Sequence, residues 1–213
     1  MLVRERMTTH PLTIQDDTSV TDALNYMRHN RVRRLPVMNK RGDLVGIVAE
    51  KDLLYASPSP ATSLSVHEIS YLLSKLKVQE VMQREVITVA PDCPLEEAAR
   101  IMVDFKIGGV PVVEDGKLLG IITETDLFKV FLEMLGAREA GWRASVAVPN
   151  RPGELAQVTA EIANRGGDIV ALGTFYGQDY TQGRITLKVR GLEKEALRDA
   201  LDKADAQVLD IRE

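Results

Sequence analysis

Two aspartates, Asp52 and Asp126, close two similar stretches of the sequence and are the residues best placed to do chemistry. The motif Gly-Ile-Ile-Thr-Glu-Thr-Asp ends at Asp126, and Gly-Ile-Val-Ala-Glu-Lys-Asp ends at Asp52. A carboxylate at the start of a helix can accept two hydrogen bonds from ribose hydroxyls. Thr123, at the preceding strand end, can donate to a phosphate, which a helix N-terminus also favours. The motif fits nucleotide recognition, although both aspartates also suit the ordinary role of helix N-cap.

A cluster of basic residues from Arg28 to Arg34 stands before the apolar pair Leu35-Pro36. One interpretation is a solvated helix end, where basic residues suit the helix dipole. The other is that Arg33 or Arg34 reaches the phosphates of a nucleotide. The second stretch has the less basic Lys-Ile-Gly-Gly at the corresponding place. Phosphate charge would then come from the first stretch, and ribose recognition from the second.

The two stretches belong to an internal duplication, which has to be recognised before the fold is assigned. The matching pairs are Met7 and Met82, Thr13 and Thr88, Pro36 and Pro111, Gly46 and Gly120, and Asp52 and Asp126. Each copy is short and buries too little surface to be stable by itself. We therefore expect the two copies to pack on each other.

Hydrophobic periodicity predicts the order strand, helix, strand, strand, helix in each copy. After the first strand, the predicted elements of the first copy are 19–30, 35–38, 44–49 and 51–55. Those of the second copy are 94–104, 110–113, 118–123 and 125–133. Between the copies, residues 57–65 are rich in proline and serine and predict a loop, and residues 66–76 predict a helix.

These residues resemble the cystathionine-β-synthase-type (CBS) domain, which occurs as tandem pairs. The resemblance covers residues 3–135 and rests on the Val-x-x-x-Met motif that ends at Met82, on the apolar-Pro-Val strands and on the closing Gly-x-x-Thr-x-x-Asp motif. It implies clefts that bind adenosyl compounds, namely AMP, ADP, ATP or S-adenosylmethionine, as regulatory ligands. Ala49 replaces the motif threonine in the first copy, so we expect one good cleft, which depends on Thr123 and Asp126.

The candidate nucleotide site combines these motif residues with the apolar strand, which can hold the base, and with the two arginines. Its members are Thr123, Asp126, Thr88, Gly109, Val110, Pro111, Asp52, Arg33 and Arg34. Pockets of this kind are mainly apolar with a few well-placed polar groups.

The last third of the chain changes to the order strand, helix, strand, strand, helix, strand, a ferredoxin-like arrangement. The phrase Asn-Arg-Pro-Gly-Glu-Leu-Ala, together with this order, resembles the ACT domain over residues 142–212. That resemblance implies a regulatory module that often binds amino acids, and the family's usual acidic residue is asparagine here. The candidate amino-acid site is Asn150, Pro152, Gly153, Glu154 and Leu155. The alternatives are that this loop only shapes the fold, or that the open sheet pairs with another subunit.

The expected fold class is α+β, a CBS pair of two βαββα units followed by a ferredoxin-like ACT domain. The expected parts are a first copy (1–56), a linker with a helix (57–77), a second copy (78–135), a linker (136–141) and the C-terminal domain (142–213). This combination resembles the AcuB-like acetoin-utilisation family, a label that implies an association rather than a reaction. We expect a homodimer that regulates an unidentified protein; the alternative is a scaffold without a ligand that regulates a metabolic enzyme.

Composition narrows the functional classes further. The net charge of −4 argues against a surface built for nucleic acid. Cys93 is the single cysteine, which is compatible with a reducing, cytoplasmic setting. The sequence shows neither a metal-binding cluster nor an apolar run long enough to span a membrane. The three histidines are scattered and suggest no nucleophile–base pair, so we expect no catalytic residues, no metal and no required cofactor.

Overall fold

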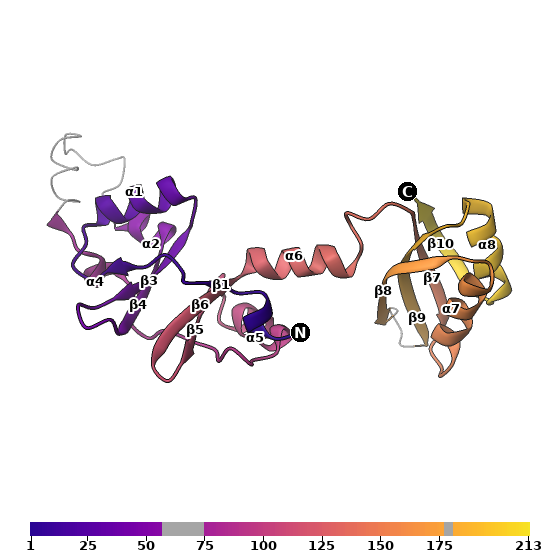
Figure 1. The fold of residues 1–213 in the computed structure, drawn as a ribbon, viewed down its shortest axis with the longest axis horizontal. Coiled ribbons are helices and arrows are strands. Elements are labelled where there is room, and N and C mark those ends of the chain that lie inside the picture. The colour runs from indigo at the N-terminus through magenta and orange to yellow at the C-terminus, as the bar shows by residue number, and fades with distance from the viewer. Residues whose placement is uncertain (57–74, 177–180) are drawn as a thin grey trace. The chain divides into compact units, whose positions relative to one another are not determined.

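The computed structural model describes residues 1–56, 75–176 and 181–213 (Figure 1). The chain divides into two compact units, Met1–Leu127 and Phe128–Glu213. The division falls inside the helix α6 (Glu124–Met134), before the predicted linker 136–141. Most of the helix predicted for residues 66–76 lies outside the described residues.

The first copy contains the predicted helices and strands. Its elements are η1 (Val3–Glu5), β1 (Thr8–Thr9), β2 (Ile14–Gln15), α1 (Val20–Asn30), β3 (Arg34–Met38), β4 (Leu44–Ala49) and α2 (Glu50–Tyr55). Ser19 is the N-cap of α1, and its hydroxyl accepts a hydrogen bond from the Asp22 amide at 3.1 Å. The apolar face of α1 packs into one core cluster with buried residues of β3, β4 and α2.

The second copy repeats this order with a shorter beginning. Its elements are α4 (Val78–Val81), α5 (Leu95–Asp104), β5 (Gly109–Glu114), β6 (Lys117–Thr123) and α6. The first strand predicted for the second copy is reduced to a single parallel bridge between Val89 and Val112. Arg31 and Lys106 follow the matching helices α1 and α5, and both adopt a left-handed backbone with φ of 54°. The duplication is therefore visible in the backbone as well as in the sequence.

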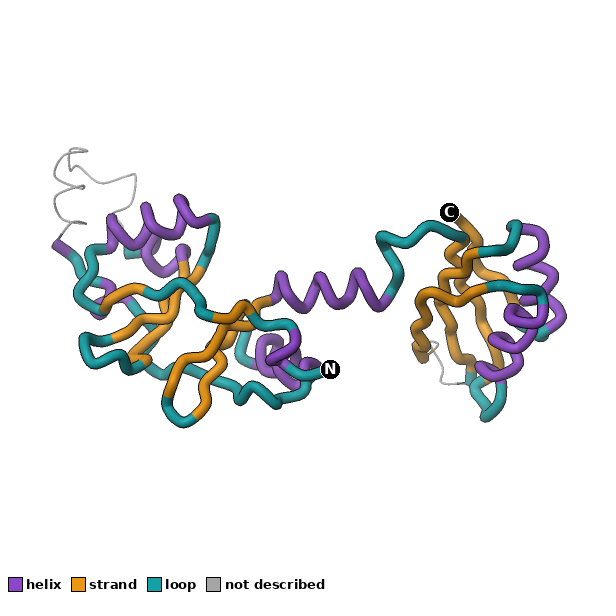
Figure 2. Tube along the Cα trace, in the orientation of Figure 1, coloured by secondary structure: helices purple, strands orange, loops and turns teal. Residues whose placement is uncertain are grey.

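The opening segment of each copy pairs with the other copy. Strand β1 joins the sheet β1-β6-β5 of the second copy, whereas β2 stays with its own copy in the sheet β2-β3-β4 (Figure 2). The backbone amide of Val3 also donates to the Cys93 carbonyl at 2.9 Å. In return, Gln83 and Ile47 exchange two backbone hydrogen bonds between the second copy and the first. The prediction that the copies pack together holds, but the exchange of segments could not be read from the periodicity.

The C-terminal unit is a four-stranded antiparallel sheet with two helices on one face. Its elements are β7 (Trp142–Pro149), α7 (Glu154–Asn164), β8 (Asp168–Tyr176), β9 (Gln182–Arg190), α8 (Lys194–Lys203) and β10 (Gln207–Arg212). The strand order β10-β7-β9-β8 confirms the ferredoxin-like prediction. Alternate residues of β7 and β9 form one core with the buried faces of α7 and α8.

Gly136 ends α6 and anchors the following turn on this unit's sheet. It has φ of +58°, and its amide donates to the Glu133 carbonyl at 3.0 Å. A methyl group at Gly136 would lie 2.9 Å from the Cβ atom of Ala171 on β8, closer than side-chain carbons normally approach. Glycine is therefore required here both by the backbone and by the close approach.

We predict that Gly136→Ala lowers the free energy of unfolding of the C-terminal unit by about 2 kcal/mol. The alanine would have to adopt a left-handed backbone, and its methyl group would overlap the side chain of Ala171. Trp142 is the only tryptophan and lies in this unit, so its fluorescence during denaturant unfolding measures the effect. Gly166→Ala is the matched control, because Gly166 has φ of +83° but open space around it. Equal losses in the two variants would show that the contact with Ala171 contributes nothing.

Candidate functional site

The first unit contains two clefts whose linings correspond to each other through the duplication. We call the first the Asp126 cleft; it has a volume of about 320 Å³. We call the second the Asp52 cleft; it has a volume of about 560 Å³. The Asp126 cleft is lined by Thr8, His10, Pro11, Leu12, Arg31, Val32, Arg33, Arg34, Pro36, Ile121, Thr123, Thr125 and Asp126. The Asp52 cleft is lined by Arg34, Ile47, Ala49, Lys51, Asp52, Gln83, Glu85, Ile87, Phe105, Lys106, Ile107, Gly108, Gly109 and Pro111.

Asp126 is held in the first turn of α6 by the strand end that precedes it. Its Oδ2 atom accepts hydrogen bonds from the Thr123 amide at 3.1 Å and from the Thr123 hydroxyl at 2.7 Å. The side chain is almost fully buried, with 8% of the residue exposed. A carboxylate has about four lone-pair sites, so capping of the helix and recognition of a ribose are compatible roles.

This geometry changes the role expected for Thr123. Its hydroxyl carries one proton, and the structure gives that proton to Asp126 rather than to the cleft. Thr123 therefore orients the carboxylate in this structure. The donors that face the Asp126 cleft with a positive charge are the arginines of the first copy.

The basic cluster of the first copy reaches the aspartate of the second. Arg31, Arg33 and Arg34 line the Asp126 cleft together with Asp126 itself. Three guanidinium groups beside one carboxylate leave a net positive charge, and the planar guanidinium suits a phosphate group. The strand exchange contributes Thr8 and His10 to the same lining.

Arg34 lies between the two clefts and lines both of them. Its Nη1 atom donates to the backbone carbonyl of Gly108 in the second copy at 2.5 Å. Burial lowers the pKa of Arg34, while the nearby carboxylate of Glu124 opposes this shift. The guanidinium remains charged at neutral pH, because the ordinary pKa of arginine is far above 7.

The Asp52 cleft repeats the helix cap but not the polar surroundings. The Ala49 amide donates to Asp52 Oδ2 at 3.0 Å, the same contact that the Thr123 amide makes with Asp126. Ala49 has no hydroxyl to add a second bond. The structure corrects the N-cap role expected for both aspartates: each is the third residue of its helix and accepts a hydrogen bond from the backbone amide of the N-cap residue, Ala49 or Thr123. The hydroxyl contact is specific to Asp126.

The predicted nucleotide residues divide between the two clefts. Thr123, Asp126 and Arg33 line one cleft, Asp52, Gly109 and Pro111 line the other, and Arg34 lines both. Val110 is fully buried and Thr88 is exposed, and neither belongs to either lining.

The candidate nucleotide site did not include Thr8, His10, Arg31 or Pro36, which also line the Asp126 cleft. The duplication could have identified Pro36, because it matches Pro111 of the other cleft. Thr8 and His10 depend on the strand exchange, for which the sequence carries no signal.

The C-terminal unit places only part of its candidate amino-acid site on a cavity. Asn150, Glu154 and Leu155 line a cavity of about 280 Å³ between the β7–α7 loop and the edge strand β8, whereas Pro152 and Gly153 are exposed and do not line it. Glu154 is 6% exposed and forms an ion pair with Arg151. The hydrogen bond to Glu154 raises the pKa of Arg151.

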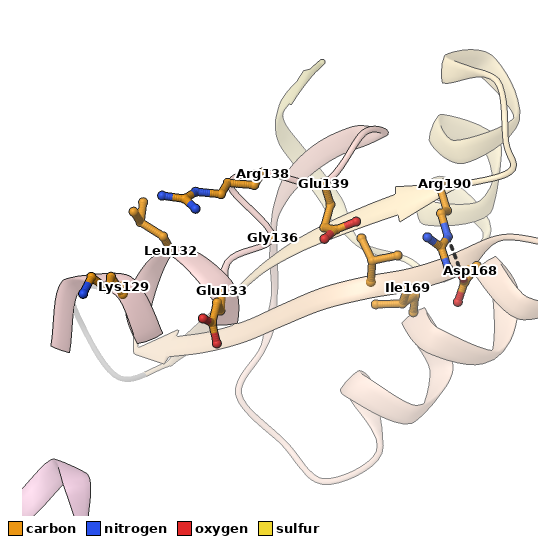
Figure 3. A pocket seen from close by; sticks show the side chains of 10 residues that line it. Lys129, Leu132, Glu133, Gly136, Arg138, Glu139, Asp168, Ile169 and Arg190 are labelled. Carbon is orange, nitrogen blue, oxygen red and sulfur yellow. Dashed lines mark hydrogen bonds and ion pairs between the residues drawn. The ribbon is translucent and has the colours of Figure 1, made fainter. Parts of the chain in front are cut away.

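A larger cavity of about 630 Å³ lies in the same unit and was not expected from the sequence (Figure 3). Its lining comes from the last turns of α6, the turn that contains Gly136, and the beginning of β8. Arg190 and Asp168 form an ion pair across part of it at 2.7 Å. Charges of both signs alternate around it, so the lining selects no single class of ligand.

Comparisons with known proteins define the class of this chain. Residues 3–59 and 78–133 match the CBS domain, and residues 140–212 match the TTHA0829-like ACT domain. The chain therefore belongs to the CBS-domain family, with a tandem CBS pair followed by an ACT domain. Both resemblances drawn from the sequence are confirmed.

Two relatives illustrate the kinds of protein that this chain resembles. The chain is 34% identical to the uncharacterized protein MJ1426 of Methanocaldococcus jannaschii, over 62% of this chain and 92% of that protein. It is 32% identical to the A-adding tRNA nucleotidyltransferase of Aquifex aeolicus, over 62% of this chain but only 15% of that enzyme. The chain thus resembles most of one protein and a minor part of an enzyme.

Three solved structures each match about two thirds of this chain. An acetoin utilization protein, AcuB, from Vibrio cholerae is 34% identical with a TM-score of 0.54, and the match covers 65% of this chain and 96% of that one. The CBS pair of protein MJ0100, in complex with 5′-methylthioadenosine and S-adenosyl-L-methionine, is 28% identical with a TM-score of 0.52, covering 65% and 98%. CBSX2 in complex with AMP is 31% identical with a TM-score of 0.51, covering 62% and 96%.

Among residues 1–56, 75–176 and 181–213, every helix is too short or too polar to cross a bilayer.

Proposed function

We propose that this protein is a non-catalytic regulator that binds an adenine nucleotide in the Asp126 cleft. One observation carries the proposal: Asp126 of the second copy and three arginines of the first line the same cleft. The carboxylate suits a ribose, and the guanidinium groups suit a phosphate. Similar CBS pairs have been solved with AMP and with S-adenosyl-L-methionine, which supports an adenosyl ligand.

The regulatory step would be a shift between arrangements of the CBS pair. A nucleotide that contacts both copies binds best to the arrangement in which Asp126 and the arginines are close together. Because β1 and β6 belong to different copies, such a ligand also stabilises the pairing of the two halves. The regulated protein would respond to this shift.

Thermal unfolding with a panel of ligands tests the proposal. AMP, ADP, ATP, S-adenosylmethionine and NADH are each added to the full chain. A ligand present at about a hundred times its dissociation constant should stabilise the folded state by about 2.7 kcal/mol. Stabilisation by at least one adenine nucleotide is the expected result. If none of the five raises the melting temperature, the alternative of a ligand-free scaffold replaces this proposal.

A homodimer remains our proposal for the assembly, through the CBS pair, the ACT domain or both. It is supported by an apolar side on α6, where Phe128 and Phe131 are exposed to 66% and 53%. Sedimentation at several protein concentrations, with and without AMP, measures the assembly directly. A concentration-independent monomer in both conditions would exclude the dimer.

For the ACT domain we propose an amino-acid ligand at the cavity beside Glu154. Asn150 and Arg184 line it with polar groups, and Phe175 adds an apolar wall. Equilibrium dialysis against the common amino acids is expected to show binding of at least one. Leu155→Arg should abolish that binding because it fills the cavity mouth, whereas Leu209→Arg, also exposed but outside the cavity, should not. Dialysis without binding of any amino acid would leave the loop with a structural role only.

A further inference from the structure

The two clefts of the CBS pair differ at positions that the duplication makes directly comparable. Where the Asp126 cleft has His10, the Asp52 cleft has Glu85, and where the first has Thr123, the second has Ala49. Where the first has Arg33 and Arg34, the second has the glycine pair 108–109. Two of these differences make the Asp52 cleft less suited to a phosphate, because Glu85 adds a carboxylate and Gly108 provides no cation in place of Arg33.

The two glycines follow from the position of Arg34. A methyl group on Gly108 would overlap Arg34 Nη2 and lie 2.6 Å from Glu124 Oε2, and one on Gly109 would lie 2.9 Å from Arg34 Cδ. Neither glycine has a positive φ, so space rather than backbone conformation requires them. The second copy thus has glycines at these two positions because Arg34 of the first copy occupies the space that their side chains would need.

Arg34 is the one cation shared by both linings, and its contact with the Gly108 carbonyl turns a hydrogen bond donor toward the second copy. Apart from Arg34, the Asp52 cleft has two lysines, Lys51 and Lys106, against two carboxylates, Asp52 and Glu85. The Asp126 cleft has Arg31 and Arg33 against Asp126, with His10 in addition. Apart from the shared arginine, one lining is therefore neutral and the other is positive.

We propose that the two clefts bind different classes of adenosyl compound: the Asp126 cleft takes a phosphorylated one, and the Asp52 cleft takes one without a negatively charged group. This rests on the proposed function, since it assigns ligands within the same CBS pair. The larger Asp52 cleft, with a volume of about 560 Å³, has room for a neutral or cationic substituent beside Glu85. A protein of this kind would respond to the concentrations of two adenosyl compounds rather than to that of one.

Calorimetric titration of the full chain tests the proposal with two probes, AMP and the uncharged 5′-methylthioadenosine. We expect AMP to bind once per chain with high affinity. The AMP-saturated protein should then still bind 5′-methylthioadenosine once per chain. Asp126→Ala should remove the AMP event and keep the other, and Asp52→Ala should do the opposite.

A charge variant tests the reason for the difference. Glu85→Gln removes the carboxylate that opposes a phosphate. In the Asp126→Ala background, titrated at high AMP concentration, it should raise the weak residual affinity of the Asp52 cleft for AMP by roughly 3- to 10-fold. Glu114→Gln is the control, because Glu114 is exposed at the end of β5 and lines neither cleft. An unchanged second-site affinity in Glu85→Gln would contradict the electrostatic argument.

The outcomes separate this inference from the proposed function. If AMP fills both clefts equally, or excludes 5′-methylthioadenosine from both, the division of ligand classes is wrong while nucleotide binding stands. If neither probe binds, the proposed function fails and the division fails with it.

Discussion

Replacing Asp126 with alanine is expected to abolish the stabilisation of this protein by AMP. The variant loses the carboxylate that we assign to the ribose, and hydrogen bonds to a charged group contribute about 1.5–3 kcal/mol each. Loss of even one such bond weakens binding by roughly 10- to 100-fold, and loss of two exceeds that range. At a fixed AMP concentration the thermal shift should therefore disappear. Fluorimetric thermal unfolding with and without AMP measures it.

The duplication supplies the matched control for this experiment. Asp52→Ala removes the same kind of helix cap, because both aspartates accept a hydrogen bond from the amide three residues earlier. Each variant should lose about 1 kcal/mol of intrinsic stability, because the amide at the start of the helix loses its carboxylate acceptor. Only Asp126→Ala should lose the response to AMP. If both variants keep the full thermal shift, Asp126 is a helix cap and nothing more, and the site assignment is wrong.

Gly120→Ala is expected to disrupt the pairing between β1 and β6 and, as a result, to change the lining of the Asp126 cleft. A methyl group at Gly120 would lie 2.9 Å from the backbone carbonyl oxygen of Thr8 and 2.6 Å from Met7 Sδ. The sulfur can move, but the carbonyl belongs to β1, which must shift away from β6. Overpacking of this kind costs about 1–3 kcal/mol. Thr8 and His10 would leave the cleft with the strand.

Hydrogen exchange at the amides of the N-terminal segment measures the displacement, and we expect faster exchange at His10, whose amide donates to the Leu119 carbonyl at 3.2 Å. Affinity for AMP should fall in the same variant. The matched control is Gly46→Ala, where a methyl group would overlap Met82 and lie 3.1 Å from the Gln83 carbonyl oxygen. It perturbs the other exchanged segment and should spare AMP binding. Normal exchange at His10 in Gly120→Ala would show that the exchanged strand is not held by this contact.

Local patterns predicted most of the elements. The helices α1 and α5 begin after Ser19 and Pro94, where the predicted segments 19–30 and 94–104 start. The paired strands on either side of Gly42 and Gly116 were also predicted, and in the structure both glycines have the positive φ that tight turns favour. These features depend on residues close together in the chain, so a sequence pattern can report them.

The site was only partly predictable, because its residues come from both copies. Sequence motifs identified Asp126 and the arginine cluster separately, and the hypothesis that they act together agrees with their shared lining. The motifs could not show that Gly109 and Pro111 line the cleft of Asp52 instead. They also assigned the Thr123 hydroxyl to a phosphate, whereas its proton goes to Asp126.

The duplicated motif and the change of pattern after residue 141 by themselves determined the class of this protein: a CBS pair followed by an ACT domain. Such patterns suffice because spacing and residue type are local properties of the chain. Only the tertiary structure decided which residues share a cleft, since the pairing of β1 with β6 and the reach of Arg34 to Gly108 join segments far apart in sequence. The two copies are alike in their motifs and differ in their clefts, because each cleft combines the residues of both.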